Sequence, residues 1–343
     1  SITEVQQMSE VVESGPVMGG RRMMKAAALL IALGYCSLLV YQGGVALNIQ
    51  ETRTGLQAPD LSIEPVTKTS VVNSGKSDNL TINNVFISVK TTKHFQTSRL
   101  PVILKTWFQL AKDQTWFFTD ITNEHHQNQT NGHMVNTNCF SSHERKPLCC
   151  KMSAEYVHFL DSGKKWFCHF DDDNYVNIPR LVSVLQKYNY REDYYFGRTS
   201  VNEPLKIYTK PKNQLTASFW FATGGAGFCL SRSLALKMLP VAGGGKFVSL
   251  CEKIRLPDDV SIGYLAEHLL KTKLTFMPEF HSHLEQMKLL PLETLKDQIS
   301  FSYSKSKDEW NVVNVPGFDT IYDPTRFLSL HCFLFPHFKF CPR

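Results

Sequence analysis

The sequence lacks several features that would assign it to common functional classes. No dense cluster of basic residues is interleaved with aromatic residues, and 37 Lys and Arg against 31 Asp and Glu leave a net charge of only +6. A dedicated nucleic-acid-binding protein is more lopsided in charge, so this class is excluded. The cysteines form no Cys-x-x-Cys pair and no paired Cys/His spacing, which argues against a zinc module. There is also no internal repeat.

The composition that remains is that of a globular protein. Hydrophobic residues make up 43% and charged residues 20% of the 343 residues, which is too apolar for a disordered chain. This length suits one large domain or two medium ones. The mild positive charge suits an anionic small ligand or an acidic partner surface.

The N-terminal region predicts entry into the secretory pathway. No charge interrupts the run from Ala26 to Gln50, and Arg21, Arg22 and Lys25 precede it. About 20 apolar residues span a bilayer, and basic residues stay on the cytoplasmic side. The alternative is a signal peptide cleaved after the small residues at 44–46. We predict a membrane anchor with this division: a cytoplasmic tail 1–25, a transmembrane signal-anchor 26–47, a luminal stem 48–83 and a folded domain 84–343.

Two further features agree with a luminal location. Eight of the nine cysteines follow the apolar segment, and in an oxidising lumen they are expected to form disulfides. Asn79 and Asn128 each begin an Asn-x-Thr sequon, which is used only in that compartment.

Apolar runs beyond residue 84 alternate with helical patterns. The expected strands are 85–89, 115–118, 166–170, 194–196, 219–221 and 274–277. The expected helices are 100–111, one ending at Gly163, one starting near Pro179, and 260–271. Strands that alternate with helices predict an α/β fold with a largely parallel central sheet.

The strongest chemical signal is the triplet Asp171–Asp173, which directly follows the expected strand 166–170. Ligands of open α/β sheets bind at the carboxyl ends of strands. Adjacent carboxylates repel one another unless a cation screens them, and a hard divalent ion with oxygen ligands typically bridges to substrate phosphates. The alternative is a solvated acidic turn.

Three weaker motifs accompany the triplet. The glycines of Thr223–Phe228 allow close backbone approach to a ligand, although their spacing fits neither a Walker loop nor Gly-x-Gly-x-x-Gly, and an ordinary tight turn is the alternative. Asp258 and Asp259 open a helix, where one could cap and the other could act as a general base. His281 and His283 are alternate residues on an extended chain, so both could face one Mn²⁺ site, or they are a surface pair.

Together these segments resemble the Fringe glycosyltransferases. The resemblance covers about three quarters of the chain, from Val85 to the end, and is carried by Val89–Lys93, Thr106–Trp107, Phe118–Asp120, Trp166–Val176, Phe219–Cys229, Arg255–Asp259, Phe280–Glu285 and Cys341–Arg343. It implies a GT-A fold and a single-pass type II Golgi membrane enzyme with a luminal catalytic domain. It also implies inverting transfer of GlcNAc from UDP-GlcNAc to the 3-hydroxyl of O-linked fucose on EGF-like repeats of Notch receptors.

The resemblance assigns roles to individual residues. Asp173 and His283 would bind Mn²⁺, Arg99 and Asp172 would contact the sugar nucleotide, and Asp259 would be the catalytic base. The implied disulfides are Cys139–Cys150, Cys168–Cys229 and Cys332–Cys341, which leaves Cys149 and Cys251 without an assigned partner.

The helix start gives a further expectation for the two neighbouring aspartates. By resemblance, Asp258 is the helix cap, and the helix dipole is expected to keep the pKa of the Asp259 carboxyl low. Two rival functions stay open. One is a different β-1,3-glycosyltransferase with another donor or acceptor, and the other is a secreted signalling module without catalysis. The second predicts the loss of a carboxylate from the triplet or at Asp259, and all four carboxylates are present.

Overall fold

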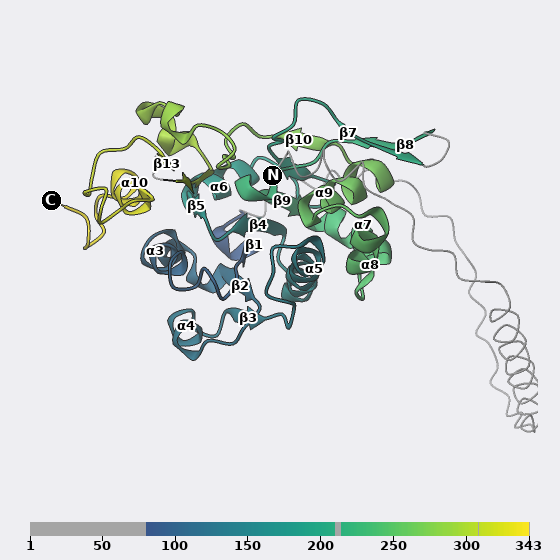
Figure 1. Ribbon diagram of the computed structural model, residues 1–343, viewed down its shortest axis with the longest axis horizontal. Coiled ribbons are helices and arrows are strands. Elements are labelled where there is room, and N and C mark those ends of the chain that lie inside the picture. Colours follow the sequence, from purple (N-terminus) through teal and green to yellow (C-terminus); the bar gives the residue numbers. More distant parts are fainter. Residues whose placement is uncertain (1–79, 210–213, 308, 343) are drawn as a thin grey trace, which may run out of the picture. The chain divides into compact units, whose positions relative to one another are not determined.

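The computed structural model describes residues 80–209, 214–307 and 309–342 (Figure 1). The expected tail, the anchor, most of the stem and the Asn79 sequon lie outside these residues. Leu80 is buried in the core and a 3-10 turn follows at Ile82–Asn84, so packed structure is already present at residue 80.

A seven-stranded sheet forms the centre of the described chain, with the strand order β10-β6-β9-β4-β1-β2-β3. All of its strand pairs are parallel except the two made by β9, which runs antiparallel to β4 and β6. The predicted α/β fold with mostly parallel strands is therefore confirmed, with β9 as the exception. The strands are β1 Val85–Lys90, β2 Thr115–Thr119, β3 Met134–Asn136, β4 Trp166–Asp171, β6 Tyr195–Gly197, β9 Phe228–Ser231 and β10 Leu274–Phe276.

Helices cover both faces of this sheet, because its strands are apolar on both faces. In β1, Val85, Ile87 and Val89 belong to one hydrophobic core, whereas Phe86 belongs to a second core on the other face. Figure 1 shows the two helical groups on opposite sides of the sheet. The first core includes α3 Leu100–Lys105, α6 Ile178–Leu185 and α10 Phe327–Leu334, and the second includes α5 Arg145–Ser162, α7 Arg232–Ala242, α8 Lys246–Ile254 and α9 Asp258–Gly263.

Several elements differ in extent from the prediction. The helix expected over 100–111 ends at Lys105, where the backbone of Thr106 leaves the helical conformation, and a 3-10 turn follows. The helix expected over 260–271 starts at Asp258 and continues as a π-helical turn over Tyr264–Leu269.

The strand expected over 219–221 is wrong in position. Strand β8 Gln214–Phe219 pairs with β7 Leu205–Thr209 in a separate hairpin, which the sequence analysis did not predict. The chain leaves this ladder at Trp220, whose N–H donates to the Glu267 carboxylate at 2.6 Å. Short antiparallel pairs also join β5 Asn174–Val176 to β11 Ser300–Ser302, and β12 Ser304–Ser306 to β13 Glu309–Asn311.

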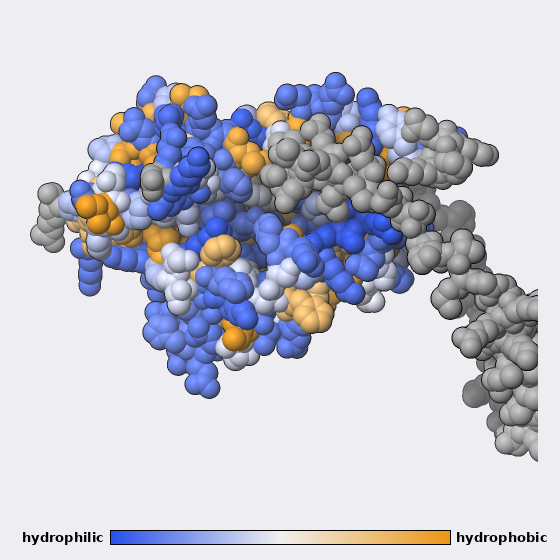
Figure 2. All heavy atoms as spheres, viewed as in Figure 1, coloured by the Kyte–Doolittle hydropathy of each residue, from blue (hydrophilic) through white to orange (hydrophobic). Residues whose placement is uncertain are grey.

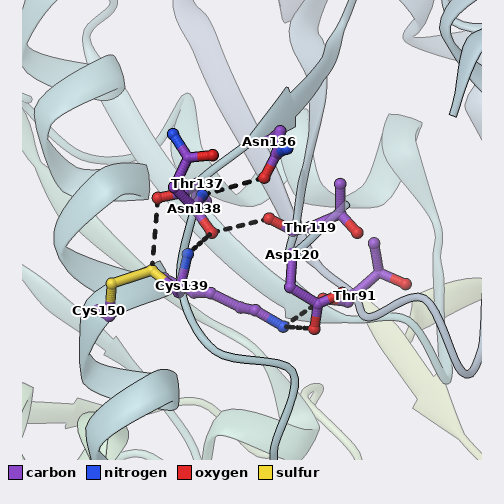
Figure 3. Close-up of a disulfide and its surroundings, with 9 residues drawn as sticks. Thr91, Thr119, Asp120, Asn136, Thr137, Asn138, Cys139 and Cys150 are labelled. Carbon is purple, nitrogen blue, oxygen red and sulfur yellow. Dashed lines mark hydrogen bonds and ion pairs between the residues drawn. A yellow bond between two sulfur atoms is a disulfide. The ribbon is translucent and has the colours of Figure 1, made fainter. Parts of the chain in front are cut away.

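Four disulfides link these elements. Three of them are the pairs that the family resemblance implied, namely Cys139–Cys150, Cys168–Cys229 and Cys332–Cys341. The fourth joins the two cysteines left unassigned, Cys149 of α5 and Cys251 of α8. Figure 3 shows Cys139–Cys150 next to the segments that follow β2 and β3.

The surface in Figure 2 is largely hydrophilic, with apolar residues in separate spots. No single continuous apolar area covers the coloured part of this face. In the described ranges no single helix is long and apolar enough to cross a membrane, and α7 with α8, bent by 74°, passes that test only as a pair. The predicted anchor at 26–47 is not among these residues.

Candidate active site

The acidic triplet lies where β4 turns into β5, at the carboxyl end of a central strand. The turn is fixed by Asn174, whose side-chain oxygen accepts the Asp171 N–H at 2.8 Å. The Asn174 amide also donates to the Gly225 carbonyl at 2.8 Å. One asparagine thus connects the acidic turn to the glycine-rich loop.

Asp171 is paired with a lysine from the neighbouring strand. Lys90 is the last residue of β1 and lies opposite Asp171 in the parallel register of β1 and β4. Its Nζ is 3.2 Å from Asp171 Oδ1, and His169 Nε2 is 3.5 Å from the same oxygen. Burial alone would raise the pKa of Asp171, but Lys90 and His169 hold that pKa well below its ordinary value. Asp171 is therefore an anion held within the structure.

Asp172 is paired with Arg99, the other residue expected to contact the sugar nucleotide. The Arg99 guanidinium lies 2.6 Å from Asp172 Oδ1, and the Thr91 hydroxyl donates to Oδ2 at 2.8 Å. The guanidinium also lies over the Phe95 ring, 3.7 Å from its centroid. Burial raises the pKa of Asp172 even though Arg99 and Thr91 oppose that shift.

Asp173 lies near His283, the other residue that the resemblance assigns to Mn²⁺. His283 Nδ1 is 3.9 Å from Asp173 Oδ2, and this buried nitrogen has no hydrogen-bond partner in the described chain. Asp173 Oδ2 also lies 3.2 Å from the Arg99 guanidinium, and Asp173 Oδ1 accepts a hydrogen bond from the Ser302 hydroxyl at 3.4 Å. Burial, together with the negative charge of Asp171, raises the pKa of Asp173 to about 8. An anion at this position therefore needs additional positive charge.

These two side chains fit a divalent cation. Burial lowers the pKa of His283, so its imidazole is neutral and its free nitrogen is available as a ligand. Across residues 80–209, 214–307 and 309–342, no group of three or more His, Cys, Asp and Glu side chains gathers around one point. Asp173 and His283 would thus be the protein ligands, and substrate phosphates and water would fill the other positions.

His281 does not join this site, in contrast to the expectation that both imidazoles could face it. His281 Nε2 lies 2.9 Å from the Gln298 side chain. Its Nδ1 lies 3.2 Å from Arg198 and 3.2 Å from Glu285. These partners hold His281 in a separate polar cluster, so His283 alone faces the carboxylates.

The glycine-rich loop runs between His283 and the predicted base. The Gly224 N–H donates to Asp259 Oδ2 at 2.9 Å. A Cβ on Gly224 would lie 3.3 Å from the Asp259 Cβ, and one on Gly225 would lie 3.4 Å from His283 Cε1. The loop can approach Asp259 and His283 this closely because Gly224 and Gly225 have no side chains. The motif is therefore more than an ordinary tight turn, because it lies next to both Asp259 and His283.

Asp259 is the more accessible of the two aspartates at the start of α9. Asp259 is partly exposed and Asp258 is 3% exposed. Asp259 Oδ1 also accepts the N–H of Val260 at 2.7 Å. Burial and the nearby Asp258 charge raise the pKa of Asp259 to about 6, against the two backbone donors. The expectation of a low pKa is wrong, because helix-end N–H groups do not outweigh burial and a like charge here.

Asp258 has a different role from the helix cap that was expected. The N-cap residue of α9 is Pro257, so Asp258 does not occupy the cap position, and no side-chain hydrogen bond caps the helix there. Instead Asp258 Oδ2 accepts Lys90 Nζ at 2.7 Å. A lysine 168 positions earlier in the chain thus neutralises the carboxylate that was expected to cap.

Sequence reasoning gave no role to Lys90, Thr91 and Ser302, although all three contact the acidic groups. Lys90 and Thr91 lie within a segment that carries the family resemblance, and Lys90 ends a strand adjacent to β4. Polar residues at the ends of adjacent parallel strands are the signal that could have identified them. Ser302 follows no comparable signal.

The comparisons with known proteins agree on one family. The family model described as Fringe-like matches residues 80–338. The Fringe glycosyltransferase of Drosophila melanogaster is 56% identical over 296 residues, which covers 85% of this chain and 71% of that protein. The β-1,3-N-acetylglucosaminyltransferases lunatic fringe of Xenopus laevis and of Homo sapiens are 44% and 47% identical, and cover 82% and 76% of this chain and 75% and 69% of theirs.

Among solved structures, the glycosyltransferase GlyE of Streptococcus pneumoniae TIGR4 matches 73% of this chain and 62% of its own, with 12% identity and a TM-score of 0.40. That likeness is too weak to add to the argument. The sequence matches are strong and long, and they cover every side chain of the site from Lys90 to His283. The chain belongs to the Fringe family.

Proposed function

We propose that the chain is an inverting β-1,3-N-acetylglucosaminyltransferase with a GT-A fold. It transfers GlcNAc from UDP-GlcNAc to the 3-hydroxyl of O-linked fucose on EGF-like repeats of Notch receptors. The observation that carries the proposal is the glycine-rich loop, in which the Gly224 N–H donates to Asp259 and Gly225 lies next to His283. Membership of a family whose vertebrate relatives are named as β-1,3-N-acetylglucosaminyltransferases supports the donor and the linkage.

The donor side of the site consists of Asp172, Asp173, Arg99 and His283. Arg99 already pairs with both carboxylates and has 24% of its side chain exposed, so it is available to a diphosphate as well. Asp173 and His283 would hold Mn²⁺. The chemistry supplied by the bound ion is neutralisation of the charge that develops on the departing UDP.

The acceptor side consists of Asp259. A secondary hydroxyl is a weak nucleophile, so a carboxylate that takes its proton during attack contributes on the order of 10²–10⁴-fold. Asp259 is partly exposed, and its pKa of about 6 leaves it ionised at neutral pH while keeping it more basic than an ordinary aspartate. Attack on the anomeric carbon from the side opposite UDP in one displacement gives inversion.

The test is transfer of labelled GlcNAc from UDP-GlcNAc to an EGF-like module carrying O-fucose, with the purified full chain. The unfucosylated module is the matched acceptor control, and UDP-galactose and UDP-glucose are the donor controls. We expect a β-1,3-linked product only with the fucosylated module and UDP-GlcNAc, and its loss in excess EDTA. Preferred use of another donor would identify a different β-1,3-glycosyltransferase, and full activity in EDTA would contradict the role of Mn²⁺.

We also propose that this domain lies in the Golgi lumen, anchored as a single-pass type II membrane protein. Arg21, Arg22 and Lys25 before the uncharged run motivate this topology. Asn128 is exposed on α4 Glu124–Gln129, where a glycan can be accommodated. Protease protection of the C-terminus in intact microsomes and a mass sensitive to glycosidase are the expected results. A protease-accessible C-terminus would contradict the topology.

A further inference from the structure

Lys90 lies between the two acidic motifs of the site. Its Nζ is 2.7 Å from Asp258 Oδ2, at the start of α9, and 3.2 Å from Asp171 Oδ1, at the end of β4. The Lys90 side chain is 11% exposed and that of Asp258 is 4% exposed. One buried ammonium group therefore joins the acidic turn next to the donor side with the helix that carries the proposed base.

Asp171, at one end of this connection, is held in place by a chain of contacts with buried residues. The Glu155 carboxylate on α5 accepts the Ser88 hydroxyl at 2.5 Å and lies 2.6 Å from His169 Nδ1. The other ring nitrogen of His169 lies 3.5 Å from Asp171. Since Ser88, Glu155 and His169 are fully buried, Asp171 is a fixed point on the sheet.

The Asp258 end is the start of a short helix that has no side-chain cap. Asp258 is fastened by Lys90, and Asp259 by the N–H of Gly224. Without the ammonium group, the buried Asp258 carboxylate would lose its counter-charge and would face the Asp171 carboxylate, which is 26% exposed and keeps His169 as a partner. Burying an unpaired charge is strongly unfavourable, so the start of α9 would move away from the sheet and Asp259 would move with it.

We propose that Lys90 is a positioning residue of the transfer reaction, which sets the separation between Asp259 and the metal-binding and donor-binding carboxylates by holding Asp258 against Asp171. This inference rests on the proposed function. Lys90 contacts neither Asp172, Asp173 nor Arg99 through a hydrogen bond or ion pair among the described contacts, so it acts on the base rather than on donor affinity.

The chain offers a matched control in a second buried lysine. Lys151 on α5 lies 2.9 Å from Asp120 and 2.8 Å from the Thr91 carbonyl, and the side chains of the pair are 3% and 0% exposed. Figure 3 shows Thr91 and Asp120 side by side at this pair, near Cys139–Cys150. The Lys151 pair is buried at least as deeply as the Lys90 pair, and among the described residues its hydrogen bonds and ion pair go to Thr91 and Asp120 and not to α9.

The experiment compares the full-length variants Lys90→Met, Asp258→Asn, the double variant and Lys151→Met, with kcat and the KM for UDP-GlcNAc measured on the fucosylated EGF-like module. A displacement of about 1 Å at a reacting group costs up to about 10²-fold. We therefore expect Lys90→Met to lower kcat by about 10- to 100-fold while the donor KM changes by less than about threefold. Lys151→Met should lower the melting temperature similarly and change kcat by less than about threefold.

The double variant tests whether Lys90 acts through Asp258. Once the Asp258 charge is gone, the ammonium group no longer holds the start of α9, and the partly exposed Asp171 keeps His169 as its partner. The double variant should therefore match Asp258→Asn within about threefold. Losses that multiply, a loss confined to the donor KM, or an equal loss in Lys151→Met would each overturn the proposal. If Lys90→Met alone does not fold, the double variant carries the test, because it replaces the buried ion pair by neutral groups.

The two proposals fail in different ways. A wild-type chain that transfers no GlcNAc rejects the proposed function before any variant is compared. An active wild-type chain together with an unimpaired Lys90→Met variant rejects the positioning role alone.

Discussion

The two acidic motifs of the site, Asp171–Asp173 and Asp258–Asp259, differ in the partners that their neighbouring carboxylates bind. In the triplet, Asp171 pairs with Lys90, while Asp172 and Asp173 share Arg99. In the pair, Asp258 is buried against Lys90 and Asp259 is bound only by backbone N–H groups. The role of each carboxylate follows from its partner, and adjacency in the sequence does not predict it.

Partners also divide the carboxylates by pKa. Lys90 and His169 keep Asp171 ionised. Asp173 pairs only with the Arg99 guanidinium among the described cations, which it shares with Asp172, and burial and the Asp171 charge raise its pKa to about 8. Asp259, next to another carboxylate, has a pKa of about 6. The same residue type thus provides both a carboxylate suited to binding a cation, Asp173, and a carboxylate suited to accepting a proton, Asp259.

The largest effect is expected from replacing Asp173, the carboxylate proposed to bind Mn²⁺. Asp173→Asn keeps the shape of the side chain and takes away the charge that faces His283, so Mn²⁺-dependent UDP binding should disappear and kcat/KM should fall by at least about 10³-fold. Calorimetric titration of UDP with and without Mn²⁺ measures the binding. Asp161→Asn, on an exposed position of α5, is the control and should behave as wild type. Mn²⁺-dependent UDP binding that survives in Asp173→Asn would assign the ion to other ligands.

The next effect separates the two aspartates at the start of α9. Asp259→Asn removes the proton acceptor and should lower kcat by about 10²–10⁴-fold with the donor KM nearly unchanged. Asp258→Asn leaves the acceptor in place and should cost about 10-fold, through position alone. Steady-state kinetics on both variants decides the order. A greater loss in Asp258→Asn would exchange the two roles.

The sequence was sufficient for the parts of the site that depend on strand ends. The acidic triplet after β4 and the histidine after β10 lie at one edge of the sheet, as the topology of an α/β fold requires. The glycine-rich segment reaches the same edge for a different reason, because it precedes the antiparallel strand β9. The family resemblance then supplied the roles proposed for Asp173, His283 and Asp259. Its disulfide pairs match those of the structure.

The pairings over long sequence separations were not accessible in the same way. Lys90 and Asp258 are 168 positions apart, and Cys149 and Cys251 are 102 apart, so neither contact leaves a local pattern. The hairpin of β7 and β8 was missed because apolar and polar residues alternate along β8, so this strand lacks the continuous apolar run that marked the other strands. The helix-cap expectation for Asp258 failed for a similar reason, since a local rule was overridden by a distant lysine.

A smaller effect is the dependence of activity on pH. Asp259 must be ionised to accept a proton, and its pKa of about 6 lies above that of an ordinary aspartate. At saturating Mn²⁺, kcat/KM should therefore be level above about pH 7 and fall by up to tenfold per unit below about pH 6. In Asp258→Asn the neighbouring negative charge is gone, so the acid limb should move to lower pH. A limb that moves to higher pH, or stays in place, would contradict the electrostatic coupling of the two residues.

The smallest expected effect on catalysis concerns the disulfides that lie behind the two acidic motifs. Cys168–Cys229 joins β4 to β9 within the sheet that carries the triplet, whereas Cys149–Cys251 joins α5 to α8, the helix that precedes Asp258–Asp259. Since Lys90 and Gly224 already fasten the start of α9, the second disulfide should contribute stability more than geometry.

Replacing Cys149 and Cys251 by alanine should lower the free energy of unfolding by about 2–4 kcal/mol and change kcat by less than about threefold. The matched control replaces Cys332 and Cys341, whose separation of 9 residues against 102 closes a much shorter loop. By loop entropy this control should lose less stability than the first variant. Denaturant unfolding followed by tryptophan fluorescence measures both losses. A drop in kcat comparable to that of Asp258→Asn would show that the position of α9 depends on the disulfide as well as on Lys90, and the distinction between the two motifs would then lie in their covalent support.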